Sequence, residues 1–226
     1  MSESPKSPRR RFLKNLAGGT AALAAGGALN ELVAQQGIPT YPPPQGGWDV
    51  SWVSKVEKAK YRAVFDAAEI ADGVTFTNAM VFMAGNKEVY NAADNEMGLV
   101  IVIRHNAITM AVNDAMWERG KLGESLKVND GDVPATRNMW IGRKGADGTV
   151  RPGPMDGLMA RGVTVLCCNL ALMRAAGQFA RAQNIPVEEA RKLYIDNLVP
   201  GVIRQTNGIF ATTRAQAAGA PMIKSS

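Results

Sequence analysis

Two polar segments that directly follow apolar runs hold the side chains best suited to chemistry. Cys168-Asn169 follows the run at residues 163–167, and Arg104-His105-Asn106 follows the run at residues 99–103. An ionised thiol is a nucleophile and can carry sulfur, and imidazole is the side chain that exchanges protons near neutral pH. The chain has no other histidine, so His105 is its one candidate for a general base of that kind.

Each of these two groups has two interpretations. A strand followed by a helix would place Cys168 at a helix N-terminus, where unpaired N–H groups and the helix dipole stabilise the thiolate of a nucleophile or sulfur carrier. Free cysteines are also common as small buried apolar residues, which is what we expect of Cys167. His105 is either a hydrogen-bonded structural residue at a strand end or a general base.

The composition excludes several classes of site. One histidine rules out a multi-histidine metal centre, and two adjacent cysteines cannot form a disulfide framework. No glycine-rich phosphate loop follows an expected strand, so no nucleotide cofactor is indicated. The formal net charge is +6, of which the first 34 residues supply +3 (five bases, two acids), leaving +3 spread over the remainder. We therefore expect no metal, no cofactor and no nucleic-acid partner.

The elements that must position these residues alternate between strands and helices. Five apolar residues in a row at 99–103, and a run at 163–167 in which Thr164 is the one polar residue, indicate strands covered on both faces, as in a parallel sheet. We expect further strands at residues 60–66, 202–205 and 222–223, and helices at residues 73–89, 107–126, 156–160, 169–183, 186–197 and 209–218. This alternation predicts an α/β domain with a single doubly wound, mostly parallel five-stranded sheet and helices on both faces.

In a sheet of this kind, ligands bind beyond the carboxyl ends of the strands. Both candidate segments, with Cys168 and His105, directly follow such ends. Residues 129–154 are rich in Gly, Asp, Pro and Arg, and are long for a connection within a compact domain. We expect this segment to cover a site or to contact another subunit.

The N-terminal segment contains a sequence that resembles the twin-arginine export signal. In that signal two arginines and any residue precede Phe-Leu-Lys, and here the matching residues are Arg9, Arg10, Phe12, Leu13 and Lys14. The weakly apolar run at residues 15–29 is short and rich in glycine for a membrane span; a small amphipathic helix or a lone membrane anchor is the alternative. We expect a signal peptide at residues 1–34, a proline-rich linker at residues 35–47 and a folded domain at residues 48–226.

A second resemblance covers residues 61–223. The sequence RGVTVLCCNLA at residues 161–171 resembles the motif of the DsrE/DsrF-like proteins, in which a Gly-Val strand ends in a cysteine and a helix follows. Residues 198–219 are similar to the last strand–helix–strand unit of that family. The resemblance implies a flavodoxin-like sheet and assembly into homotrimers or homohexamers. In some members it also implies sulfur carriage, as a persulfide, on the cysteine that matches Cys168.

The first functional hypothesis is an exported DsrE-like homo-oligomer that binds or relays sulfur on Cys168. His105, Asn106 and Asn169 would line the pocket, and the partner would be a protein that donates or accepts sulfur. The export signal places the protein in the periplasm, where an uncleaved signal would provide its one attachment to the membrane.

Two alternatives remain open. One is a non-catalytic binding or assembly module of the cell envelope, a subunit of a larger membrane-associated complex; the linker, the segment 129–154 and Trp48, Trp52 and Trp140 favour it. The other is an enzyme in which His105 activates Cys168, which requires these two side chains to meet.

Overall fold

The computed structural model describes residues 39–145 and 147–225, and its main folded unit begins at Tyr41. The predicted signal, with Arg9, Arg10, Phe12, Leu13 and Lys14, lies outside the described residues. Within them, no helix is both long enough and apolar enough to cross a membrane.

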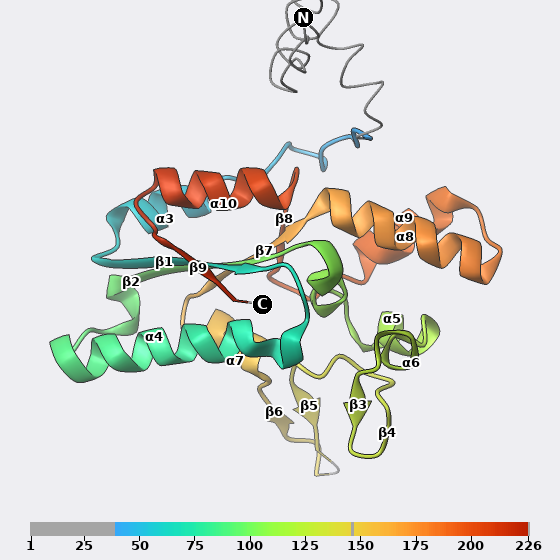
Figure 1. The fold of residues 1–226 in the computed structure, drawn as a ribbon, viewed down its shortest axis with the longest axis horizontal. Coiled ribbons are helices and arrows are strands. Elements are labelled where there is room, and N and C mark those ends of the chain that lie inside the picture. Colours follow the sequence, from blue (N-terminus) through green and yellow to red (C-terminus); the bar gives the residue numbers. More distant parts are fainter. Residues whose placement is uncertain (1–38, 146, 226) are drawn as a thin grey trace, which may run out of the picture. The chain divides into compact units, whose positions relative to one another are not determined.

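A five-stranded parallel sheet forms the centre of the folded unit (Figure 1). The strands lie in the order β8-β7-β2-β1-β9. Their bounds are Tyr61–Ala67 (β1), Met97–Ile103 (β2), Thr164–Cys168 (β7), Ile203–Gln205 (β8) and Met222–Lys224 (β9). The predicted class, a doubly wound, flavodoxin-like α/β sheet with five parallel strands, is confirmed.

Helices cover both faces of the sheet, which explains why its central strands are apolar without alternation. Helix α4 (Val74–Tyr90) and helix α7 (Pro154–Ala160) lie on one face, and α3 (Trp52–Lys58) and α10 (Gly208–Ala217) lie on the other (Figure 1). Every residue of β2 and β7 is buried. Successive side chains of β2 point to opposite faces, so that Val100 and Val102 pack with residues of α3 and α10.

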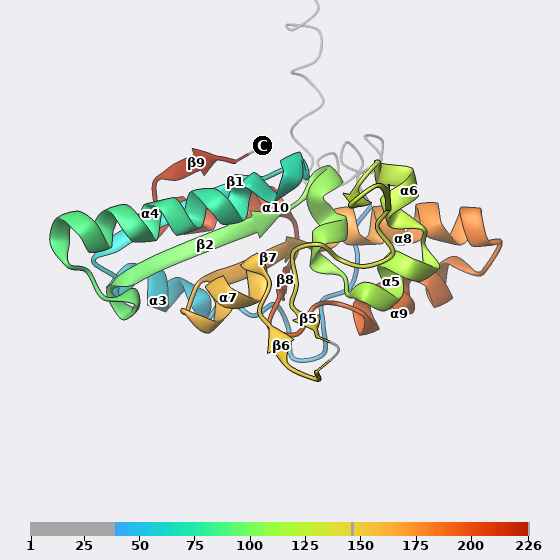
Figure 2. The ribbon, with the colours of Figure 1, turned by 90° about the horizontal axis from the view of Figure 1, so that it is seen from below.

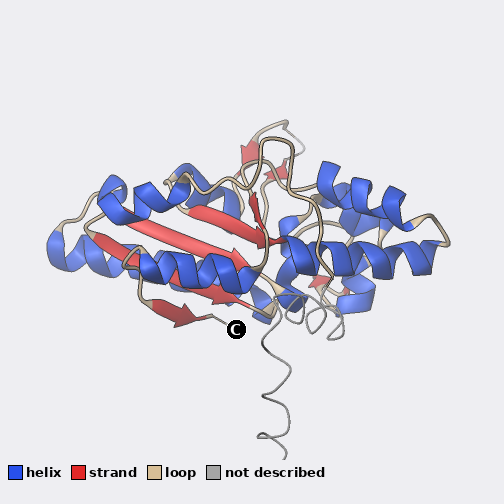
Figure 3. Ribbon diagram, turned by 90° about the horizontal axis from the view of Figure 1, so that it is seen from above, coloured by secondary structure: helices blue, strands red, loops and turns tan. Residues whose placement is uncertain are grey.

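Several helices lie beyond the carboxyl ends of the strands (Figures 2 and 3). The predicted helix at residues 169–183 is confirmed as α8 (Asn169–Gln183), and α9 (Val187–Asp196) packs against it. The prediction of a single helix at residues 107–126 is wrong. The chain there forms a 3-10 helix, η4 (His105–Ala111), followed by α5 (Asp114–Arg119) and α6 (Leu122–Leu126).

Local capping explains this break. The side chain of Asn113 accepts a hydrogen bond from the N–H of Met116 and so begins α5. Lys121, with φ of 46°, turns the backbone into the left-handed region between α5 and α6. The apolar residues that predicted one helix are therefore divided among three short helices, η4, α5 and α6.

The segment 129–154 is more ordered than expected for a long loop. It contains two short hairpins, β3 (Asn129–Asp130) with β4 (Val133–Pro134) and β5 (Arg143–Lys144) with β6 (Val150–Arg151). Between them, the indole of Trp140 packs edge-on against Trp117, with ring centroids 5.7 Å apart. Buried Asn138 donates hydrogen bonds to two carbonyl groups at the end of η4. The segment is thus anchored to the core.

Candidate functional site

Cys168 lies where β7 ends and α8 begins. It is the N-cap residue of α8, and its Sγ accepts a hydrogen bond from the N–H of Ala171 at 3.3 Å. The residue is 6% exposed, whereas Cys167 has no exposed surface. Burial raises the pKa of Cys167 to about 12, with a smaller opposing effect from the charge of Arg204. Cys167 is therefore a neutral thiol within the sheet, as expected.

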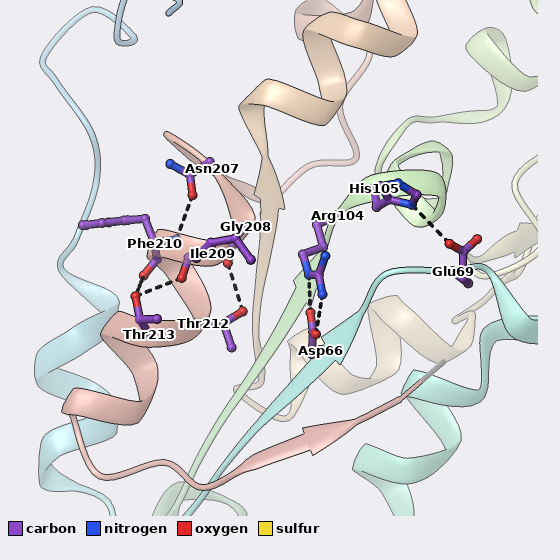
Figure 4. A network of polar contacts seen from close by, with 10 residues as sticks. All are labelled: Asp66, Glu69, Arg104, His105, Asn207, Gly208, Ile209, Phe210, Thr212 and Thr213. Carbon is purple, nitrogen blue, oxygen red and sulfur yellow. Dashed lines mark hydrogen bonds and ion pairs between the residues drawn. The ribbon is translucent and has the colours of Figure 1, made fainter. Parts of the chain in front are cut away.

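Arg104 is the neighbour of Cys168 at the carboxyl edge, the edge of the sheet at which β1, β2, β7 and β8 end. The parallel register pairs Ile103 with Cys167, so the next residues of the two chains, Arg104 and Cys168, are adjacent. The guanidinium of Arg104 donates to both oxygens of Asp66, at 2.6 and 2.7 Å (Figure 4). This hydrogen bonding raises the pKa of Arg104 against the effect of burial, and the charges of Asp66, Cys168 and Glu69 raise it further.

The start of α10 holds Arg104 from the other side. The aliphatic stem of Arg104 lies against Gly208, the first residue of α10. A Cβ atom at position 208 would come within 2.6 Å of Cδ of Arg104, so this approach requires glycine. Asn207 caps the helix by accepting a hydrogen bond from the N–H of Phe210 at 2.8 Å (Figure 4). Asp66 and Gly208 together fix the position of the guanidinium.

His105 and Asn106 form a separate cluster around Glu69. Nδ1 of His105 lies 3.1 Å from Oε1 of Glu69, and Nδ2 of Asn106 donates to both oxygens of that carboxylate, at 3.1 and 2.9 Å. Arg174 of α8 donates to Oδ1 of Asn106 at 3.3 Å. His105 has φ of 53°, in the left-handed region that is unusual for a residue with a side chain. The cluster ties η4 to the loop after β1 and to α8.

The predicted site residues are therefore only partly brought together. Among the described residues no hydrogen bond joins His105 to Cys168, because the ring of His105 pairs with Glu69. Asn169, the first residue of α8, is buried and accepts a hydrogen bond from Nη1 of Arg204 at 3.1 Å. The arrangement does not form the nucleophile–base pair that an enzyme using His105 and Cys168 would need.

A buried amide completes the surroundings of Cys168. Gln205 pairs with Cys168 in the register of β7 and β8, so their side chains leave the sheet on the same face. Its Nε2 donates to the carbonyl groups of Asp49 and Arg204, at 2.6 and 3.0 Å. Its Oε1 is buried and has no hydrogen-bond partner in the described structure.

No family model matches the chain, and no curated protein matches it. Among solved structures, the chain is similar to a protein of unknown function, MTH1491 from Methanobacterium thermoautotrophicum. The two are 14% identical over 73% of this chain and 99% of that one, with a TM-score of 0.38. A likeness this distant carries no argument about the site.

Sequence reasoning named Arg104 only as part of the segment Arg104-His105-Asn106, and it missed Asp66 and Arg204 as members of the site. A signal for two of them was present. Asp66 is an acid near the end of a mostly apolar strand, and Arg104 is the first polar residue after the strongest apolar run. Nothing in the sequence indicated that these two would pair with each other, since that depends on β1 lying beside β2.

Other kinds of site are not supported near Cys168. In the described part of the chain, no group of three or more His, Cys, Asp or Glu side chains is placed to hold a metal ion. An open depression of about 420 Å³ lies at the opposite, amino end of β1, lined by Lys60, Tyr61, Arg62, Phe82, Gly219 and Pro221. The chemistry available at the carboxyl edge is that of a thiol beside a guanidinium and a helix N-terminus.

Proposed function

We propose that this protein carries sulfur as a persulfide on Cys168, within a homotrimer or homohexamer that is exported to the periplasm by the twin-arginine route. One observation supports it above the others. Of the two cysteines, Cys168 alone has exposed surface and accepts an N–H at the start of α8, and Arg104 follows the end of the neighbouring strand beside it. Exposed surface lets a sulfur donor reach the thiol, and a helix N-terminus is a favourable place for negative charge on sulfur.

The chemistry is thiol exchange. The thiolate of Cys168 attacks the sulfane sulfur of a donor, a new S–S bond forms, and the donor's bond to that sulfur breaks with its electron pair leaving on the donor. A second thiolate, that of the acceptor, then takes the outer sulfur and regenerates Cys168. The N–H of Ala171 and the charge of Arg104 stabilise negative sulfur in both steps.

Mass spectrometry of the native protein after incubation with polysulfide tests this function. We expect one added sulfur atom, located on Cys168 by peptide mapping and removed by cyanide. Cys168→Ser abolishes the addition, whereas the matched variant Cys167→Ser retains it. Sulfur on Cys167, or on neither cysteine, would show that the carrier assignment is wrong.

Export is tested separately, in cells. Replacing Arg9 and Arg10 together by lysine removes the feature that the twin-arginine route requires. We expect the variant to remain in the cytoplasmic fraction, and the unchanged protein to be found in the periplasm or on the periplasmic side of the membrane. If the variant and the unchanged protein were found in the same cell fractions, the export route would be contradicted. The persulfide chemistry would not be affected by that result.

Exposed apolar side chains at several positions around α4 favour a second candidate function, a non-catalytic binding or assembly module. Met80, Val81, Val89 and Tyr90 on this helix are 39–69% exposed. Large apolar side chains gathered on one exposed helix are typical of a protein–protein contact. In this case Val81→Lys disrupts the biological role and the assembly state, while Cys168→Ser leaves both intact. If the protein instead carries a persulfide, Cys168→Ser abolishes its biological role.

A further inference from the structure

The open depression at the amino end of β1 has walls of two kinds. Its volume, about 420 Å³, is in the range of sites that bind small molecules. The rings of Tyr61, Phe82 and Pro221 supply apolar surface, and Lys60 and Arg62 supply positive charge. No acid is among the described residues that line it. Walls of this composition suit a ligand with a flat apolar body and an anionic group.

The guanidinium of Arg62 is held in place while some of its donors are unused. Nε donates to the carbonyl group of Ala59 at 2.6 Å, and Nη1 donates to that of Ala218 at 3.3 Å. Within the described residues, Nη2 donates to no group and Arg62 forms no ion pair with a carboxylate. A Cβ atom at position 219 would come within 2.6 Å of Nη1, so the guanidinium lies directly against Gly219. A fixed guanidinium with free N–H groups is suited to bind a carboxylate.

The two aromatic rings are also fixed by contacts outside the depression. The ring of Tyr61 stacks on Tyr90, the last residue of α4, with centroids 5.4 Å apart and planes inclined by 19°. Phe82, also on α4, packs edge-on against buried Phe65, with centroids 6.2 Å apart. The end of α4 and the amino end of β1 lie together on the left of Figure 1. Because the rings are already ordered, a ligand that packs against them does not have to immobilise them.

The charges around the depression limit how much negative charge a ligand can carry. Nζ of Lys60 lies 4.0 Å from the carboxylate of Glu96, and the lysine side chain is 64% exposed. The carbonyl groups that hold Arg62 belong to the C-cap residues of α3 and α10, and helix C-termini carry partial negative charge. These helix ends oppose a phosphate with two charges more strongly than a single carboxylate. The depression therefore favours a ligand with one negative charge.

We propose that this depression binds a small aromatic monocarboxylate. The carboxylate lies between Lys60 and the free N–H groups of Arg62, and the ring of the ligand packs against Tyr61 and Phe82. Cys168 lies at the other, carboxyl end of the strands. The inference therefore goes beyond the proposed sulfur chemistry and does not rest on it.

A matched pair of ligands tests this assignment on the full-length chain. The compounds 2-naphthoate and 2-naphthamide have the same fused rings, and only the first carries a charge. In calorimetric titrations we expect the naphthoate to bind about fivefold more tightly than the naphthamide, since the carboxylate gains the attraction of a nearby cation. Equal affinities, or no binding of the naphthoate at millimolar concentration, would overturn the proposal.

Lys60→Gln tests the contribution of charge with little risk to the fold, because this side chain is exposed. We expect the affinity for 2-naphthoate to fall by about threefold to fivefold and that for 2-naphthamide to stay the same. Lys58 is the matched control, since it is exposed in the last turn of α3 and does not line the depression. Lys58→Gln should leave both affinities unchanged. If the two substitutions had the same effect, only the net charge of the chain would matter and the site would be wrong.

Amide chemical shifts locate the bound ligand. On addition of 2-naphthoate we expect the largest changes at residues 60–62 and 219–220, which line or adjoin the depression. Tyr61→Leu should weaken the binding of both ligands by a similar factor, about twofold to tenfold, because both lose the same aromatic contact. Shift changes centred on Cys168 and Asn169 would instead place the ligand at the carboxyl end of the sheet and contradict the proposed site.

Discussion

Arginines occur at both ends of the sheet, and the two ends use them differently. At the amino end, Arg62 donates to the carbonyl groups of Ala59 and Ala218, at 2.6 and 3.3 Å, which are the C-cap residues of α3 and α10. At the carboxyl end, Arg104 and Arg204 lie against the first residues of α10 and α8. Arginine side chains thus contact helix C-termini at the amino end of the sheet and helix N-termini at its carboxyl end.

The two arrangements differ in their expected effect on stability. A cation at a helix C-terminus is stabilising by about 0.3–1 kcal/mol, and the same cation at an N-terminus is destabilising by a similar amount. Arg62 therefore contributes to stability as it stands. At the carboxyl edge, the guanidinium of Arg204 bonds to the first residue of α8, whereas that of Arg104 is paired with Asp66.

The largest effect is expected from Asp66→Ala at the carboxyl edge. Asp66 is the one carboxylate that pairs with Arg104, and both side chains are mostly buried. Its removal leaves a partly buried guanidinium unpaired, which should lower the free energy of unfolding by about 2–4 kcal/mol in urea titrations. Asp66→Ala combined with Arg104→Met should recover part of the loss. A change below about 0.5 kcal/mol would mean that the pair is only a surface contact.

Glycines at two positions provide the next test. Gly208→Ala introduces a Cβ against the stem of Arg104, which Asp66 prevents from moving away, and should cost about 1–3 kcal/mol. In contrast, Gly85 lies in the interior of α4 with open space around it, so Gly85→Ala should stabilise the protein by about 0.5–1 kcal/mol. Thermal unfolding of the two variants compares them directly. Equal shifts would contradict the close packing at the start of α10.

The sequence was sufficient to predict the sheet because β2 and β7 are buried on both faces, and their sequences are therefore nearly continuous apolar runs. The helix after Cys168 could also be predicted, since its apolar residues recur at helical spacing. The interruptions of the expected helix 107–126 at Asn113 and Lys121 were missed. The spacing of apolar residues does not show where a residue caps a helix or adopts the left-handed conformation. Helix α3 was missed as well, because a two-turn helix has little periodicity to detect.

For the candidate site, the sequence identified residues but not their partners. Cys168 and Asn169 were expected at the start of a helix, and that is where they lie. His105 was expected to line the same pocket, but Glu69, which follows a different strand, binds it instead. Pairings such as Asp66 with Arg104 depend on which strands are neighbours, and that order is a property of the folded chain.

The smallest expected effect is also the most direct test of the contrast between the two ends. Arg62→Ala removes hydrogen bonds to two helix C-termini and should lower the free energy of unfolding by about 1–2 kcal/mol. Arg204→Gln loses one bond to a neutral amide and relieves a cation at the N-terminus of α8, so its unfolding free energy should change by less than about 0.5 kcal/mol. If Arg204→Gln were instead as destabilising as Arg62→Ala, Arg204 would be a structural residue and the two ends of the sheet would be alike.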